Sequence, residues 1–131
     1  MTTPTERYTV YPITPVGKPR MTRRDRWKKR PCVERYFAFR DLVALHGVHL
    51  PEYGAKIVFG LPMPASWPKK KRLSLASQPH LQKPDVDNLL KGLMDAVYPD
   101  EDSRVWDIAG LRKVWATDGF IRIEFSRQEV A

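Results

Sequence analysis

The segment from His80 to Asp107 concentrates acidic residues inside a chain that is otherwise basic. It holds seven of the 15 Asp and Glu, whereas the whole chain has 23 Lys and Arg and a net charge of +8. Its middle part also carries apolar residues at the spacings of an amphipathic helix, namely Leu90, Leu93, Met94 and Val97. The segment can therefore present carboxylates on a packed helix within a protein whose other surfaces attract polyanions.

Composition limits the classes of protein that the chain can form. With 131 residues, 42% of them hydrophobic, we expect one domain (residues 1–131) with a single core. A pI near 9.8 favours DNA or RNA as the partner, and no membrane partner is expected. The single cysteine, Cys32, excludes an intrachain disulfide. The absence of a secretory or membrane-spanning apolar run predicts a cytoplasmic location.

The order of secondary-structure signals predicts the fold class. β-Strands are expected at residues 8–13, 55–61, 108–117 and 120–127, and helices at 32–46 and 87–97. The first helix should bury a stripe formed by Tyr36, Phe37, Leu42, Val43 and Leu45. The order β-α-β-α-β-β predicts an α+β domain with two main helices on one face of a mixed or antiparallel sheet. Asp118-Gly119 predicts a hairpin between the last two strands, and residues 64–79 a long loop.

Three carboxylates and a lysine form the candidate catalytic set. In a helix that begins near Asp87, that residue shares a face with Lys91 and Asp95. Asp85 lies just before the first turn, and the acidic run 100–102 can fold back beside the helix N-terminus. Carboxylate oxygens suit Mg²⁺, which could hold a scissile phosphate as one ion or a pair. Lys91 could stabilise charge that develops on the phosphate.

Each of these residues also has a purely structural interpretation. Asp85 is a candidate helix N-cap, and Asp87 can complement the helix dipole. Asp87, Lys91 and Asp95 can also form an exposed ladder of ion pairs that contributes little.

A longer pattern favours the catalytic interpretation. The run KPDVDNLLK (83–91), followed by MDA (94–96) and DSRV (102–105), resembles the motif of the RusA family of Holliday junction resolvases. The resemblance implies that Asp85, Asp87 and Asp102 bind metal and that Lys91 is the catalytic basic residue. The third ligand is the least defined by position, because Asp100 and Glu101 are adjacent, and the role of Asp95 stays open.

The same resemblance implies an activity, a cofactor, partners and a bacterial or phage-infected host cell. It implies a homodimer that resolves four-way DNA junctions by paired nicks in recombination and repair, using Mg²⁺ with Mn²⁺ as a possible substitute. Two alternatives remain: a nuclease of the same fold that cuts other branched or flapped DNA, and a non-catalytic protein that only binds branched DNA. The presence of all three carboxylates and Lys91 favours an enzyme over the binding protein.

Two positive blocks are the expected DNA contacts, through phosphates and without base readout. The expected contact residues are Lys18, Arg20, Arg23, Arg24, Lys69, Lys70, Lys71, Arg72 and Lys83. Trp27 and Trp67, which lie within these blocks, could stack on unpaired bases or could instead cover part of the core.

Overall fold

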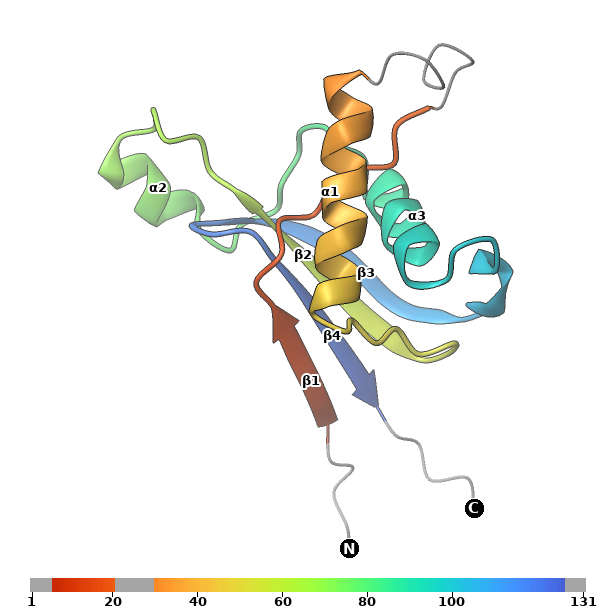
Figure 1. Ribbon diagram of the computed structural model, residues 1–131. Helices are drawn as coiled ribbons and strands as arrows, with labels where there is room; N and C mark the ends of the chain where they lie inside the picture. Colours follow the sequence, from red (N-terminus) through yellow and green to blue (C-terminus); the bar gives the residue numbers. More distant parts are fainter. Residues whose placement is uncertain (1–5, 21–29, 127–131) are drawn as a thin grey trace, which may run out of the picture.

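Four strands form one mixed sheet, and two long helices pack against one of its faces (Figure 1). The computed structural model describes residues 6–20 and 30–126. The strands are β1 (Glu6–Tyr11), β2 (Ala55–Pro62), β3 (Ile108–Ala116) and β4 (Phe120–Ser126). The helices are α1 (Pro31–Leu45), α2 (Lys69–Leu75) and α3 (Val86–Val97), with a 3₁₀ turn at Asp102–Arg104. This arrangement confirms the predicted α+β class.

The sheet order, β1-β4-β2-β3, shows that the predicted hairpin is wrong. β3 and β4 follow one another in the chain, but they lie on opposite sides of β2, parallel and antiparallel to it. The Asp118-Gly119 turn therefore joins strands that do not pair. Gly119 is needed there for a different reason, because a Cβ atom would lie 2.3 Å from the Thr14 hydroxyl oxygen and 2.7 Å from its Cα.

The core lies between the sheet and the two long helices. On β2, Ile57, Phe59 and Leu61 are buried on the face that carries the helices, while Lys56 is exposed on the other. α3 contributes Leu89 and Leu93. The side of this helix that was predicted to face inward does so, but the prediction did not include Leu89.

The apolar stripe predicted for α1 is only partly correct. The buried residues recur at three- and four-residue spacings and are Val33, Tyr36, Phe39 and Val43. Leu42 and Leu45 are 40% and 79% exposed. At about 100° per residue, Leu45 lies about 200° around the helix from Val43, so it cannot share the buried face.

Residues 64–79 contain a helix where a continuous loop was predicted. α2 has no buried residue, so it leaves no apolar periodicity in the sequence, and it projects from the edge of the domain (Figure 1). Its start is secured because Arg72 Nη1 donates to the Pro64 carbonyl oxygen at 2.9 Å and the Lys71 ammonium lies 4.1 Å from the Trp67 ring centre. In the part of the chain that the structure describes, no helix is long and apolar enough to cross a bilayer.

Candidate active site

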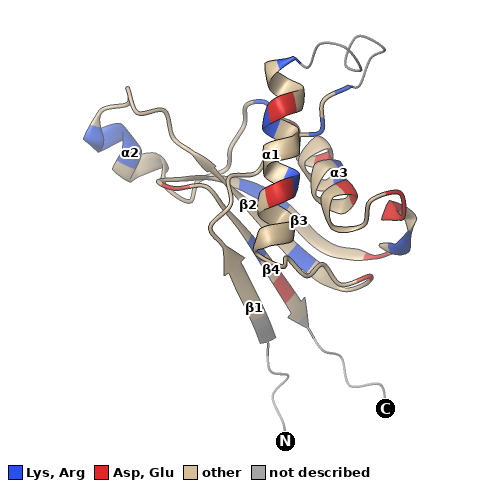
Figure 2. Ribbon diagram, viewed as in Figure 1, with Lys and Arg blue, Asp and Glu red and all other residues tan. Residues whose placement is uncertain are grey.

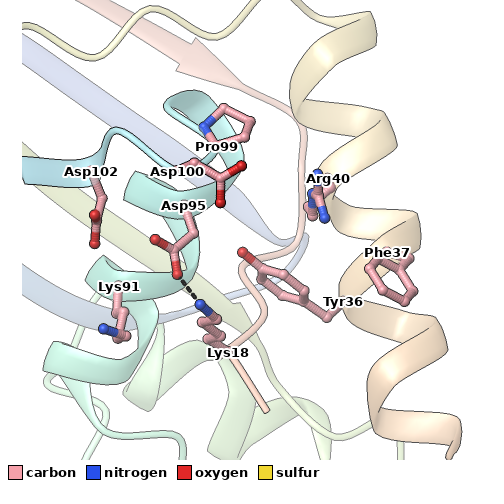
Figure 3. Close-up of a pocket in the computed structure, with 9 residues that line it drawn as sticks. All are labelled: Lys18, Tyr36, Phe37, Arg40, Lys91, Asp95, Pro99, Asp100 and Asp102. Carbon is pink, nitrogen blue, oxygen red and sulfur yellow. Dashed lines mark hydrogen bonds and ion pairs between the residues drawn. The ribbon is translucent and has the colours of Figure 1, made fainter. Parts of the chain in front are cut away.

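A pocket of about 420 Å³ lies between α1, α3 and the turn after α3 (Figure 3). The segment that follows β1 also reaches it, so four regions of the chain meet here. Its lining residues are Lys18, Tyr36, Phe37, Arg40, Lys91, Asp95, Pro99, Asp100 and Asp102. The structure thus brings together two of the four predicted catalytic residues, Lys91 and Asp102, with Lys18, a predicted DNA contact. It adds Arg40 and an aromatic wall, neither of which was predicted to belong to a site.

Asp102 reaches the pocket because the chain reverses directly after α3. Asp100 has a φ of 62°, a left-handed conformation that Asp adopts more readily than most residues. Arg104 then fastens the turn to the segment before β2, since its Nε donates to Glu52 Oε1 at 3.0 Å. The acidic run therefore returns beside α3, where Asp100 and Asp102 meet Lys91 and Asp95 in the pocket (Figure 3). The predicted return was to the N-terminus of the helix, and Asp85 and Asp87, which lie there, are not part of this lining.

Lys91 presents an uncommitted ammonium group to the pocket. Asp87 and Asp95 lie one turn away on either side of it on α3, but it forms no ion pair or hydrogen bond with a described residue. The predicted alternative of an ion-pair ladder along α3 therefore does not occur through this lysine. Because lysine carries three N–H donors, all three are available to an incoming anion.

Asp95 forms an ion pair with a different cation, Lys18. Its Oδ2 accepts a hydrogen bond from Lys18 Nζ in an ion pair that joins α3 to the segment after β1 (Figure 3). The Asp95 side chain is 16% exposed and that of Lys18 32%. The pair is therefore shielded on the carboxylate side and reachable on the ammonium side.

Asp85 and Asp87 lie at the start of α3, outside the pocket lining. Asp85 occupies the N-cap position, but its side chain makes no capping hydrogen bond, so the predicted structural alternative for it is not realised. Asp87 Oδ1 accepts a bond from the Asn88 backbone N–H at 2.9 Å. Both aspartates are exposed, and Asp87 precedes Lys91 by about 6 Å along the helix axis.

The donor set suits a hard divalent cation without forming a closed cage for it. Among the described residues, no three His, Cys, Asp or Glu side chains are grouped so that they could hold a metal ion. Mg²⁺ needs no such group, because it typically takes one or two carboxylates and completes its shell with water and substrate phosphate. Asp85 and Asp102 have no ion-pair partner among the described residues, so each can supply a carboxylate oxygen of this kind.

Tyr36 links α1 to the pocket floor. Its hydroxyl donates to the Gly92 carbonyl oxygen at 2.9 Å. Burial, with a smaller contribution from the Asp95 charge, raises its pKa from 10.0 to about 12. Tyr36 therefore stays protonated at neutral pH and keeps its role as a donor.

We expect the stability of the protein to fall between pH 10 and 12 because of Tyr36. The raised pKa means that the folded state favours the neutral phenol, so this contribution is complete below pH 10 and is lost as the pH rises through about 12. Tyr36→Phe should cost about 1 kcal/mol at pH 7 because it removes the hydrogen bond. Urea unfolding of both proteins from pH 7 to 12 measures this, and the difference between them should shrink above pH 10. A constant difference would contradict the assignment.

Lys113 supports the chain just before Asp85. Its ammonium, on β3, donates to the Gln82 carbonyl oxygen and, at 2.8 Å, to that of Pro84. His80 packs on Trp115 with ring centres 4.2 Å apart and is 4% exposed. Burial and the Lys113 charge lower the His80 pKa. The segment that leads to Asp85 and Asp87 (the D-x-D pair) is therefore held to the sheet by a half-buried lysine.

The predicted DNA contacts lie in three parts of the chain. Lys18 lines the pocket and Arg20 follows it, while Arg23, Arg24 and Trp27 lie outside the described residues. α2 carries the second positive block, residues 69–72 (Figure 2), and Lys83 is exposed in the segment before α3.

The four basic residues of α2 are not equivalent. Arg72 and Lys71 hold the helix to Pro64 and Trp67, whereas Lys69 and Lys70 are exposed. Trp67 also packs on Trp115, with ring centres 4.7 Å apart. This favours the interpretation in which Trp67 supports the fold over the one in which it stacks on a base.

We expect the double variant Lys69→Gln, Lys70→Gln to weaken DNA binding with little effect on folding. The slope of log affinity against log salt should fall by about 0.9 for each phosphate that the variant no longer neutralises. Fluorescence anisotropy from about 50 to about 300 mM salt would measure the slope. Lys56→Gln, on the far face of the sheet, is the matched control. A slope equal to that of the wild type would show that α2 does not contact the DNA.

Sequence reasoning missed several residues of the site. Tyr36 and Arg40 were assigned to a helix without a role in the pocket, and the partner of Asp95 was not foreseen. The spacing of Tyr36 and Arg40 by one helical turn was the available signal, because it places both on one side of α1.

Comparison with known proteins agrees with the geometry. A family model described as endodeoxyribonuclease RusA matches residues 12–125, which include both long helices, the pocket and nearly all of the sheet except β1. Neither the curated proteins nor the solved structures contain a significant match to the chain. The family match covers most of the 131 residues, and the chain therefore belongs to the RusA endodeoxyribonuclease family.

Proposed function

We propose that this protein is a Mg²⁺-dependent endonuclease that cuts four-way DNA junctions by paired nicks, acting as a homodimer. The observation that carries the proposal is the meeting of Lys91 and Asp102 in one pocket, at the helix that begins with the D-x-D pair, in a member of this family. The +8 net charge supports DNA as the substrate.

In this mechanism Asp85, Asp87 and Asp102 would supply the protein ligands of Mg²⁺, one or two carboxylates to an ion, with water and substrate phosphate completing its shell and Mn²⁺ as a substitute. The bound ion supplies an activated water and neutralises charge on the scissile phosphate. Lys91 donates to a phosphate oxygen as charge develops on it, which its free N–H groups allow. Tyr36 and Phe37 line one wall of the pocket.

A labelled synthetic four-way junction tests this proposal directly. We expect cleavage in Mg²⁺ or Mn²⁺, none with EDTA, and much slower cleavage of linear duplex of the same sequence. Equal cleavage of junction and flap, with much slower cleavage of duplex, would support the alternative of a nuclease that cuts other branched or flapped DNA. Tight junction binding without any cleavage would support the alternative of a non-catalytic protein that binds branched DNA.

The proposed active form of the protein is a homodimer. A four-way junction needs cuts in two strands of like polarity, and two sites related by a two-fold axis can supply them. Analytical ultracentrifugation at micromolar concentration should therefore give a dimer. A monomer both alone and on junction DNA would contradict paired nicking.

A further inference from the structure

We propose that Lys18 is a second phosphate-binding cation of the pocket and that Asp95 is the residue that positions it. The inference rests on the proposed nuclease function and deepens it, because it moves an expected DNA contact from a surface block into the active-site pocket and removes Asp95 from the candidate metal ligands. Lys18 then acts on the DNA phosphate beside Lys91, and Asp95 acts only through Lys18.

The backbone of Lys18 is fixed on α3. Its N–H points to the Asn88 carbonyl oxygen at 3.4 Å, one turn from Lys91. A Cβ atom on Gly92 would lie 2.8 Å from the Val16 carbonyl oxygen and 3.2 Å from the Lys18 nitrogen. Only glycine therefore lets the segment lie this close to the helix, and the position of Lys18 relative to Lys91 is set by backbone packing.

The side chain of Lys18 is fixed in turn by Asp95. The ion pair uses one of the three N–H groups of the ammonium, and no other described residue takes the remaining two, which can donate to phosphate oxygens. Lys18 is twice as exposed as its partner, at 32% against 16%, so a ligand in the pocket meets the ammonium more readily than the carboxylate. A metal ion at Asp95 Oδ2 would have to displace this lysine.

Lys18 neutralises part of the negative charge of the pocket. The lining carries three carboxylates, Asp95, Asp100 and Asp102, and three cations, Lys18, Arg40 and Lys91, so its formal charge is zero. Without Lys18 the pocket would be negative, and a phosphodiester would be repelled before any metal ion arrived. Lys18 offsets the charge of Asp95 and keeps the pocket accessible to DNA.

A double-mutant cycle tests whether Asp95 affects catalysis only through Lys18. Lys18→Met should lower kcat/KM for junction cleavage by about 10²-fold, the scale of one transition-state donor, and Asp95→Asn by about 10-fold. Lys18→Arg should stay within about threefold of wild type because it keeps a cation. The double variant Lys18→Met, Asp95→Asn should be no slower than Lys18→Met alone. Effects that multiply would show that Asp95 acts independently and would overturn the positioning role.

Two further measurements separate this proposal from a merely structural ion pair and from failure of the nuclease function. In EDTA, where no cleavage can occur, Lys18→Met should reduce the salt slope of junction binding by about 0.9, while the control Lys56→Met should not. Calorimetry should give Asp95→Asn the same Mn²⁺ affinity as wild type. Unchanged binding by Lys18→Met, or a weaker Mn²⁺ affinity of Asp95→Asn, would overturn the proposal even if the wild type proved inactive as a nuclease.

A backbone variant tests the same idea with every charge in place. In Gly92→Ala the added Cβ must push residues 16–18 away from α3. We expect kcat/KM to fall in the direction of Lys18→Met, while the melting temperature shows whether the fold survives. A folded Gly92→Ala protein with full activity would contradict the close placement of Lys18.

Discussion

Asp87→Asn is expected to lower the rate of junction cleavage by about 10³-fold or more, equivalent to about 4 kcal/mol of barrier, with binding retained or tightened. The substitution removes a proposed metal ligand and one negative charge beside the DNA, so catalysis and binding should change in opposite directions. The same result is expected for Asp85→Asn and Asp102→Asn. All three side chains are free of ion pairs within the described chain, so replacing them should not unfold the protein.

Single-turnover cleavage and anisotropy on the same junction would measure the two effects of Asp87→Asn. Asp118→Asn, an exposed acid in the turn between β3 and β4, is the matched control and should behave as wild type. Nicking by Asp87→Asn at a rate near that of the control would show that the metal assignment is wrong.

Lys91→Ala should produce the second largest effect, a decrease of about 10²- to 10³-fold in kcat, with metal affinity unchanged. Its ammonium has no partner in the described structure, so its removal breaks no internal hydrogen bond and leaves the carboxylates in place. Lys91→Arg keeps the charge and should recover part of the rate, though not all of it, because the guanidinium is larger and planar.

Rapid-quench kinetics and Mn²⁺ calorimetry together test the role of Lys91. A variant that loses Mn²⁺ affinity as well as rate would make Lys91 a structural partner of the acids. An unchanged kcat would exclude it from the reaction.

The sequence was sufficient for the parts of the fold that depend on local periodicity. α3 was predicted from the spacing of its apolar residues and begins within one residue of the expected start. The hairpin failed because strand pairing is decided by distant partners: β2 takes the place between β3 and β4, and Asp118-Gly119 carries no information about that choice. α2 was missed because a helix with no buried face leaves no apolar period.

The site shows the same division between local and distant information. The shared face of Lys91 and Asp95 follows from a spacing of four residues and could be predicted. The Lys18–Asp95 pair spans 77 residues, and its partners are joined only by the packing of the segment after β1 on α3. Lys113 likewise supports the loop before Asp85 from β3, through carbonyl groups that any sequence would have. Such interactions depend on the tertiary fold.

Cleavage of a supercoiled plasmid that extrudes a four-way junction tests the central claim most directly. Two nicks made within the lifetime of one complex give linear plasmid, whereas a single nick releases the supercoiling, reabsorbs the junction and leaves an open circle. We predict linear product in Mg²⁺, none in EDTA, and none with Asp87→Asn. Open circles as the only product, or linear product in EDTA, would contradict paired, metal-dependent cleavage.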